Sequence, residues 1–376
     1  MPDNEIIWIA STSALNELAA TLAQQRLIAV DTEADSLYSY FEKVCLVQIS
    51  TRENDYVIDP LAVTLAPLAP IFSDARVEKT FHAAEYDILC LKRDYGFEFA
   101  NLFDTMIAAR ILGWEKVGLG NILEARYGVA LNKKFQRADW GRRPLSRAEL
   151  DYAREDTHYL LALRELQIGE LQKHNRLDEA REAFARLARS APTPRQFDPD
   201  GYAHISGARQ LDPARRGILR ELYRFRDAQA RRENRPPFKI LSDATMLAIA
   251  TARPVSARAL QNLSGITSHI FQRYSSAILD AIRTGLARPQ AQLPRATHSD
   301  ALDPRARARL GKLKEWRKAR AEARGVATDV IISNDMLFAL ARQNPQTLDA
   351  LLQSEMGAWK IQTYGEEILA VLNGKK

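Results

Sequence analysis

The 376-residue sequence is poor in cysteine and has no long apolar run. Cys45 and Cys90 are its only cysteines, and they lie in the apolar stretches "KVCLVQIS" and "DILCLKRDYG". We expect both thiols to be reduced core residues, because free cysteine buries like a small hydrophobic residue and one distant pair makes no disulfide framework or zinc site. No apolar segment approaches the ~20 residues that cross a bilayer, so no membrane partner is expected.

Two further signals are missing from the sequence. The first residues, "MPDNEIIWIA", carry acids where a secretory signal needs a basic region, so a cytoplasmic location is expected. No GxxxxGK[ST] motif occurs, so ATP-driven unwinding of nucleic acid is not expected. Lysine and arginine outnumber the acids by six, and the pI is near 9.2, which favours polyanionic partners.

The first 165 residues or so alternate strand-like and helix-like segments. The strand-like segments are short and rich in β-branched and aromatic residues: "EIIWIA", "RLIAVDTE", "KVCLVQIST", "NDYVIDP" and "VEKTFH". The helical patterns are "STSALNELAATLAQQ", "EYDILCLKRDYG", "LFDTMIAARILG" and one long helix over "PLSRAELDYAREDTHYLLALRELQIGELQKHNR", which opens with a capping box. The pattern predicts an α/β domain with a mixed sheet flanked by helices.

The C-terminal half contains an internal repeat with an offset of 91 residues. The tripeptide "LDP" at 211–213 returns at 302–304, and "MLAIA" from Met246 returns as "LFALA" from Leu337. Each copy has helical periodicity and no strand signal, so we expect two small all-helical modules. A proline-rich, polar stretch, "RSAPTPRQFDPDGY", marks the boundary before them.

Two carboxylates follow directly on an apolar run in "LIAVDTEADS". Side chains alternate across a strand, so Asp31 and Glu33 would project from the same face a few ångströms apart. Two like charges held that close need a cation or a proton between them.

Further carboxylates could complete such a site. "HAAEYD" is predicted to leave a strand and enter a helix, which places Asp87 on the first turns. "DYAREDTHYL" places Tyr152 and Asp156 four apart, on one helical face. Taken singly, each acid is more often a solvated surface residue, and Tyr152 could pack in a core.

Taken in order, these motifs resemble those of the DEDD superfamily of 3′→5′ exonucleases. Asp31-x-Glu33, Asp87 and Tyr152-x-x-x-Asp156 are similar to its three motifs in the tyrosine-bearing branch. The run "FQRADWGRRPLSRAELDYAREDTHYL" resembles ribonuclease D, and the repeated module resembles the HRDC (helicase and RNase D C-terminal) domain through "FRDA" and "WRKA". The resemblance covers nearly the whole chain.

The resemblance implies a fold and a domain order. It implies a ribonuclease H-like mixed sheet flanked by helices, followed by two small all-α HRDC-like domains. The expected boundaries are 1–190 for the exonuclease domain, 191–207 for a linker, 208–287 for the first HRDC-like domain, 288–300 for a second linker and 301–376 for the second HRDC-like domain.

The resemblance also implies a metal site with two divalent ions, Mg²⁺ or Mn²⁺. The proposed ligands are all carboxylates, and hard oxygen donors select these ions over zinc. By carry-over, Asp31 bridges both ions, Glu33 and Asp156 complete one site, and Asp87 holds the other ion. Tyr152 would orient the attacking water. Its ordinary pKa of ~10 makes it a poor free base at neutral pH.

Residues just before the last motif are expected to contact substrate. Arg142 and Arg143 suit phosphate, and Trp140 suits stacking on a base. For Gln136 and Trp140 a structural role in fixing the loop remains an equal alternative.

Three residues that follow the first motif leave the same choice open. Leu37, Tyr38 and Tyr40 could contact the terminal nucleotide, and packing explains them nearly as well. The segment from Arg305 to Arg324 contains nine basic residues and only two acids. We therefore expect the C-terminal modules to bind the phosphate backbone of a nucleic acid.

The leading hypothesis is a metal-dependent 3′→5′ exoribonuclease that releases nucleoside 5′-monophosphates. If the resemblance to ribonuclease D extends to substrate, it trims the 3′ ends of tRNA precursors and other small structured RNAs. A 3′→5′ DNA exonuclease and a catalytically inactive nucleic-acid-binding scaffold are the alternatives.

Overall fold

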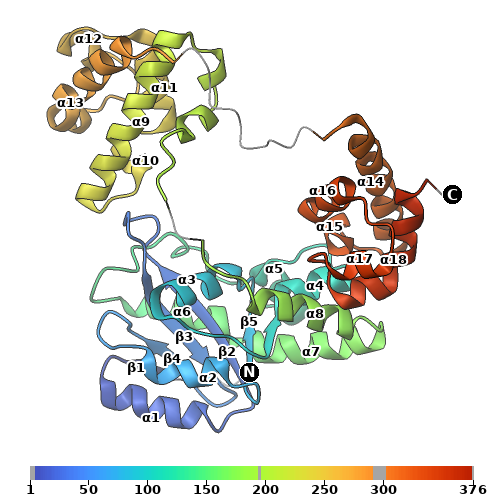
Figure 1. The fold of residues 1–376 in the computed structure, drawn as a ribbon. Helices are drawn as coiled ribbons and strands as arrows, with labels where there is room; N and C mark the ends of the chain where they lie inside the picture. The colour runs from blue at the N-terminus through green and yellow to red at the C-terminus, as the bar shows by residue number, and fades with distance from the viewer. Residues whose placement is uncertain (1–4, 194–195, 291–301, 375–376) are drawn as a thin grey trace. The chain divides into compact units, whose positions relative to one another are not determined.

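The computed structural model describes residues 5–193, 196–290 and 302–374. It divides the chain into two compact units, which are Met1–Ala34 with Val44–Pro192 and Ala301–Lys376, and Asp35–Lys43 with Thr193–Asp300. The first unit therefore holds the α/β domain together with the second helical module. The first helical module belongs to the other unit (Figure 1).

A mixed sheet of six strands forms the centre of the α/β domain within the described residues. The strands are β1 (Ile6–Ile9), β2 (Leu27–Ala34), β3 (Val44–Ser50), β4 (Asp55–Ile58), β5 (Glu78–Phe81) and β6 (Leu102–Asp104). Their order across the sheet is β1-β4-β3-β2-β5-β6. β2 pairs antiparallel with β3 over most of its length but parallel with β5 only over Leu27–Ala29, so its second half extends past β5.

Helices cover both faces of this sheet. They are α1 (Thr12–Leu22), η1 (Ala66–Leu68), α2 (Ala69–Ser73), α3 (Glu85–Tyr95), α4 (Thr105–Leu112), α5 (Leu119–Tyr127), α6 (Arg147–His158), α7 (Leu160–Lys173) and α8 (Leu177–Ala188). The predicted α/β class with a mixed, helix-flanked sheet is confirmed.

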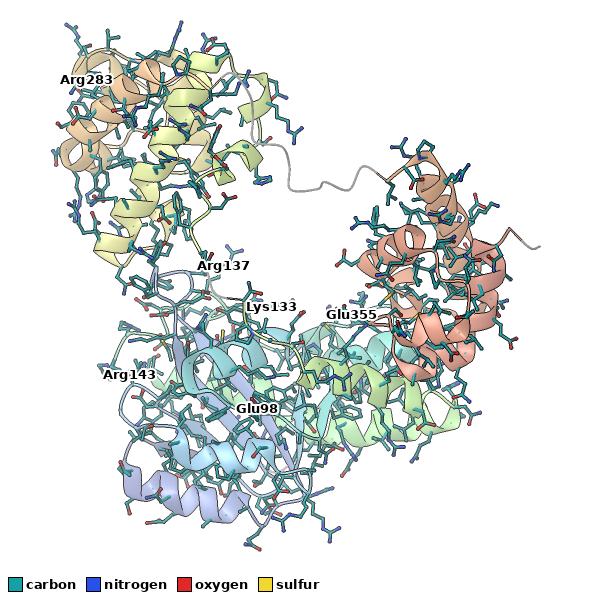
Figure 2. The ribbon with its side chains drawn as sticks, viewed as in Figure 1. Glu98, Lys133, Arg137, Arg143, Arg283 and Glu355 are labelled. Atoms are coloured by element: carbon teal, nitrogen blue, oxygen red, sulfur yellow. The ribbon has the colours of Figure 1, made fainter. Side chains whose placement is uncertain are left out.

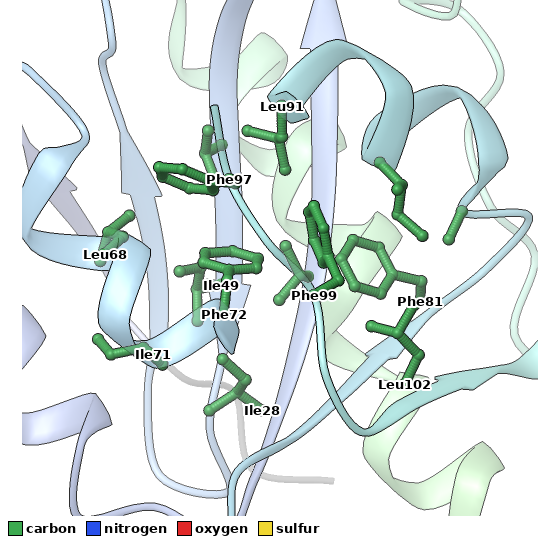
Figure 3. Close-up of a cluster of buried hydrophobic side chains, with 14 of the residues drawn as sticks. Ile28, Ile49, Leu68, Ile71, Phe72, Phe81, Leu91, Phe97, Phe99 and Leu102 are labelled. Carbon is green, nitrogen blue, oxygen red and sulfur yellow. The ribbon is translucent and has the colours of Figure 1, made fainter. Parts of the chain in front are cut away.

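Alternate residues of the strands enter two different cores. Ile28 and Ile49 join Phe72 and Leu91 in the larger core, under α1, α2 and α3 (Figure 3). The next residue of β2, Ala29, packs instead on α7. The period of two therefore assigns the two faces of β2 to different helical layers.

Two helix predictions need correction. The pattern starting at Leu102 was expected to be helical throughout, but its first three residues form β6, and α4 begins only after the Asp104 N-cap. The short segment carries no strand period of its own, and pairing with β5 decides its state. The long helix expected up to Arg176 is two helices, α6 and α7, separated at Tyr159.

The repeat in sequence is a repeat in structure. The first copy consists of α9 (Pro213–Glu233), α10 (Pro237–Ile240), α11 (Asp243–Ala252), α12 (Ala257–Gln261) and α13 (Ser268–Ala287). The second consists of α14 (Pro304–Arg324), α15 (Thr328–Ile331), α16 (Asn334–Gln343), α17 (Leu348–Leu352) and α18 (Ala358–Leu372). The first four pairs of helices begin 91 residues apart, which confirms the offset, and the last pair begins 90 residues apart, so the second copy is one residue shorter before its last helix.

The second copy packs against the α/β domain within the first unit. Val330 of α15 joins the same core as Phe184 of α8. The Arg324 guanidinium donates to the carboxylate of Glu179, which is 1% exposed, at 2.5 and 3.0 Å, and to the hydroxyl of Tyr364 at 2.6 Å. The second module is therefore part of the same compact unit as the α/β domain.

The linker expected over 191–207 is too long at its C-terminal end. Gly201–His204 forms η2, which precedes η3 (Ala208–Gln210). Tyr202 and Ile205 are buried in the core of the first helical module, because these apolar side chains cover α9. Most of the second expected linker, 288–300, lies outside the described residues.

Residues Asp35–Lys43 form a loop between β2 and β3 that belongs to the second unit. Tyr40 is buried in the core of the first helical module, and its hydroxyl donates to Asp227 at 2.8 Å. Of the two roles left open for Tyr40, the structure supports packing. Among the described helices, none is long and apolar enough to span a membrane.

Replacing Arg324 with alanine is expected to destabilise the first unit by about 3–5 kcal/mol, because the buried Glu179 carboxylate loses its ionic partner. Urea unfolding of the full chain measures the change. The matched variant Arg305→Ala removes an exposed cation of the same helix and should cost no more than about 0.5 kcal/mol. Equal stability of the two variants would contradict the structural role of Arg324.

Candidate active site

β2 presents two carboxylates on the face of the sheet that α7 covers. Ile28 and Val30 enter the larger core, so Asp31 and Glu33 point to the opposite face with Ala29. The neighbouring strand β5 ends at Phe81, opposite the middle of β2. The second half of β2 therefore has no strand beside it on that edge, which leaves room for ligands from helices.

The helix α6 carries Tyr152 and Asp156 to this face. It begins at the predicted capping box, in which Ser146 Oγ accepts from the Glu149 N–H and the Glu149 carboxylate accepts from the Ser146 N–H at 2.7 Å. Ala153, one residue after Tyr152, is fully buried against β3 and β4.

Two polar contacts attach the end of α6 to the sheet. The hydroxyls of Ser50 and Thr157 lie 2.7 Å apart, and His158 Nδ1 lies 2.7 Å from the Asp55 carboxylate. All four side chains are buried or nearly so. These contacts come directly after Asp156 in α6 and fix the rotation of the helix about its axis.

The predicted ligands meet in space. Carboxylate oxygens of Asp31, Glu33 and Asp156 all lie within 4.8 Å of one another. Asp87 comes from α3, and its Oδ1 accepts from the Thr32 N–H at 3.1 Å and from the Thr32 hydroxyl at 2.5 Å. Residues from β2, α3 and α6 thus converge on one point, although Asp87 is tied to Thr32 rather than placed within the three-carboxylate group.

The pKa values of all four acids are raised. Burial is the largest cause for Asp31 and Glu33, followed by the charges of Asp87 and Asp156, and it holds both pKa values well above the ordinary range. Burial also raises the pKa of Asp87 and of Asp156 to about 7 each. Like charges at this distance in a buried site fit a divalent cation, since its charge would replace the protons.

Tyr152 is held by aromatic neighbours beside the acids. Its ring stacks on Trp140, with centroids 5.9 Å apart, and meets Phe135 edge-on at 6.1 Å. Burial and then the charge of Asp156 raise the pKa of its phenol further above 10. The hydroxyl therefore stays protonated and can donate or accept a hydrogen bond, as its expected role in orienting water requires.

A cavity of about 320 Å³ opens beside the acids. Gln136 lines it together with Tyr152 and Asp156, and this position favours substrate contact over a purely structural role for Gln136. Sequence reasoning missed two other lining residues, Asn121 and Lys133, although "LNKKFQ" could have been noticed as a basic run in a loop (Figure 2 labels Lys133).

The other three residues expected to bind substrate differ in how far their side chains are exposed. Trp140 is 1% exposed under Tyr152, which favours the packing alternative. Arg143 (Figure 2) donates to both oxygens of Asp59 and to the carbonyls of Trp140 and Cys45, at 2.6–2.8 Å. These bonds favour a structural role for Arg143, whereas the side chain of Arg142, 60% exposed, pairs with Glu149 at the start of α6.

His82, the residue after β5, lines the same cavity. Its Nδ1 lies 2.8 Å from the Thr105 hydroxyl. Burial lowers the pKa of its imidazole to about 4, so the ring is neutral at physiological pH. His82 is therefore held by a hydrogen bond just after the end of β5.

With this geometry established, comparison with known proteins identifies the family. The 3′–5′ exonuclease family model matches residues 6–167, and the HRDC domain model matches residues 215–282 and 306–372. Ribonuclease D of Gluconacetobacter diazotrophicus is 30% identical over 375 residues, covering 98% of this chain and 93% of that protein. This chain belongs to the ribonuclease D family. Its activity is that of a 3′→5′ exoribonuclease.

Solved structures agree with this membership. The catalytic core of RRP6 from Trypanosoma brucei is similar with a TM-score of 0.70 at 30% identity, over 76% of this chain and 80% of that one. Escherichia coli RNase D has the same fold, with a TM-score of 0.67 at 22% identity and 99% of both chains covered. DEDD exonucleases use divalent metal ions, and the acidic cluster could bind one.

The raised pKa values predict how metal and pH affect stability. Without metal, the folded protein keeps protons on Asp87 and Asp156 between about pH 4 and 7 that the unfolded chain has released, so its stability falls as the pH rises through this window. A divalent ion stabilises the deprotonated form. Thermal melting should therefore show a larger increase in Tm with Mg²⁺ or Mn²⁺ at pH 8 than at pH 5, and an equal increase at both would contradict the site.

Proposed function

We propose that this chain removes nucleoside 5′-monophosphates one at a time from RNA 3′ ends with two divalent ions, Mg²⁺ or Mn²⁺, and that its substrates are tRNA precursors and other small structured RNAs. The observation that carries the proposal is the convergence of three carboxylates within 4.8 Å, with Asp87 beside them. Every candidate donor is a carboxylate oxygen, which fits these ions.

In this proposal, Asp31, Glu33, Asp87 and Asp156 hold the ions. When bound, two such ions activate a water and neutralise the charge on the leaving oxygen. The protein's own contribution is to fix the donors on rigid elements: β2 presents two of them, and α3 and α6 one each. The protonated hydroxyl of Tyr152 orients the attacking water, and the ring is fixed by Trp140.

The cavity beside the acids is proposed to hold the last nucleotide. Gln136 and Asn121 offer hydrogen-bonding groups, and Lys133 offers a positive charge for phosphate. The imidazole of His82 can form a hydrogen bond with a ribose hydroxyl. Because the ring is neutral, it would not repel a bound metal ion. The printed description of the Escherichia coli relative as involved in structured RNA processing supports the choice of substrate class.

The proposal is tested by digesting an end-labelled tRNA precursor, resolved at single-nucleotide resolution, with and without EDTA. We expect stepwise shortening from the 3′ end with release of 5′-monophosphates, and no shortening in EDTA. Matched DNA strands of the same sequence should be shortened more slowly, because DNA lacks the 2′-hydroxyl that the polar side chains of the cavity are proposed to bind. Faster digestion of DNA would favour the DNA exonuclease, and no metal-dependent release would favour the inactive scaffold.

Asp31→Asn is expected to lower kcat by about 10³-fold or more, because metal-assisted charge stabilisation contributes several kcal/mol. The control Glu98→Gln removes an exposed acid of the same domain (Figure 2) and should keep the wild-type rate. Initial rates of nucleotide release, measured by chromatography, distinguish the two. A wild-type rate for Asp31→Asn would remove this residue from the site.

Tyr152→Phe keeps the ring packed on Trp140 and removes only the hydroxyl, so the fold should be unchanged while kcat falls by about 10²-fold. The rate should fall equally at pH 7 and pH 9, because the pKa of the phenol lies above both values. Thermal melting checks the fold. A loss of activity that disappears at one of the two pH values would show that Tyr152 acts through its own titration.

A further inference from the structure

Two aromatic rings at one end of the first helical module are unusually exposed. Phe41, in the loop after β2, is 57% exposed, and Phe238, in α10, is 54% exposed. No other aromatic ring in the described parts of the chain exceeds 45%. With Tyr38, Arg231 and Lys239 they make up what we call the aromatic-basic surface.

The loop that carries Phe41 is held in place by contacts with the first helical module. Tyr40 is buried in the core of the module and bonds to Asp227, and the backbone N–H of Phe41 donates to Asn234 Oδ1 at 2.9 Å. Asn234 ends α9 in the left-handed conformation, at φ 46°. The backbone of Phe41 is therefore anchored while its ring is presented to solvent.

Two cations, Arg231 and Lys239, lie over aromatic rings of this surface. The Arg231 guanidinium carbon is 5.9 Å from the ring centroids of both Tyr40 and Phe41, and Lys239 Nζ is 3.9 Å from that of Tyr38. In the described residues neither cation forms a salt bridge, whereas Arg226 pairs with Asp243 in the same module. Residues 196–290 include fifteen Lys or Arg and eight Asp or Glu, so this segment carries a net positive charge.

The second copy of the module lacks these features at the equivalent positions. The 91-residue offset places Glu322 at the position of Arg231 and Asp329 at the position of Phe238. Asp329 pairs with Arg110 of α4, and its neighbour Val330 is buried in the core of the α/β domain. The same end of the module is thus a docking surface in the second copy and an aromatic and basic one in the first.

This combination fits single-stranded nucleic acid. Unpaired bases stack on aromatic rings, each stack contributing about 1–3 kcal/mol, while arginine and lysine contact the phosphates without reading sequence. A duplex hides its base faces, so it could use the cations but not the rings. The loop is also the direct chain continuation of β2, which holds Asp31 and Glu33.

We propose that the aromatic-basic surface binds the single-stranded 3′ extension of the RNA substrate, with bases stacked on Phe41 and Phe238 and phosphates on Arg231 and Lys239. The proposal rests on the proposed function, since it assigns the part of the substrate upstream of the nucleotide being removed. The first helical module is then the substrate clamp, and the second supports the catalytic unit.

The test measures binding of a fluorescent twelve-residue oligoadenylate to the full chain in EDTA, where no hydrolysis is expected. The double variant Phe41→Ala with Phe238→Ala should raise Kd by at least about tenfold. The double variant with leucine at both positions keeps apolar bulk and should lose binding similarly, whereas Phe238→Trp should retain it. A 2-aminopurine base in the oligonucleotide should be quenched by the wild type and less by the double variants.

Controls use exposed side chains elsewhere in the same module. Val255→Ala, at an 87% exposed position, and Arg283→Ala (Figure 2) should leave Kd unchanged. A blunt duplex should bind the wild type and the double alanine variant equally. Thermal melting and light scattering check fold and oligomeric state.

The proposal is overturned if the double alanine variant binds the oligoadenylate like the wild type, if the controls weaken binding as much, or if duplex binding falls equally. It is also overturned if the rings alter self-association and not RNA affinity, since the surface would then be a protein interface. Binding in EDTA is independent of hydrolysis. If the binding test fails while metal-dependent release of nucleotides is intact, only the proposal for the aromatic-basic surface is contradicted.

Discussion

The mutual repulsion of buried carboxylates is the constraint on which the rest of the site depends. Asp31 and Glu33 are one residue apart on a strand, so the backbone holds them on one face whatever their charge. Asp156 from another element is forced into the same space. Folding must supply the free energy that brings these groups together, and a proton or a divalent ion then lowers the cost.

Much of the surrounding structure keeps α6 in place against that repulsion. A capping box fixes its start, Ala153 packs its middle, and His158 with Asp55 holds its end. Arg143 bonds the loop that carries Trp140 to Asp59, which supports the position of Trp140 against Tyr152. The catalytic geometry is thus supported by groups that never touch a substrate.

The repeated module shows how one fold supports two tasks. The helices of the copies correspond nearly residue by residue, yet the end formed by the first long helix and the following short one carries different side chains. In the second copy Arg324 pairs with Glu179 and Val330 enters the α/β core. In the first copy the same end holds the loop after β2 and exposes Phe238. Cations of α14 that looked like part of a phosphate-binding run have partners within the fold: Arg317 donates to the carbonyl of Ile332 inside the module, and Arg324 pairs with Glu179 of the α/β domain.

The sequence by itself determined the features that depend on local periodicity. Enrichment in β-branched and aromatic residues predicted β1 to β5, the 91-residue offset predicted the paired helical modules, and the spacing of Asp31 with Glu33 predicted a shared face. Local signals failed for β6, which has three residues and depends on pairing with β5, and for the division between α6 and α7 at Tyr159.

Tertiary structure alone decided which polar side chains are free to act. Arg142 and Arg143 are adjacent arginines, yet the side chain of Arg142 is mostly exposed, whereas that of Arg143 forms an ion pair with Asp59, 84 residues away in the chain. Tyr40 likewise finds its partner 187 residues away. Because such partners are remote in sequence, no local pattern can show whether a charge or ring is satisfied within the fold, and only packing in three dimensions separates the structural residues from the functional ones.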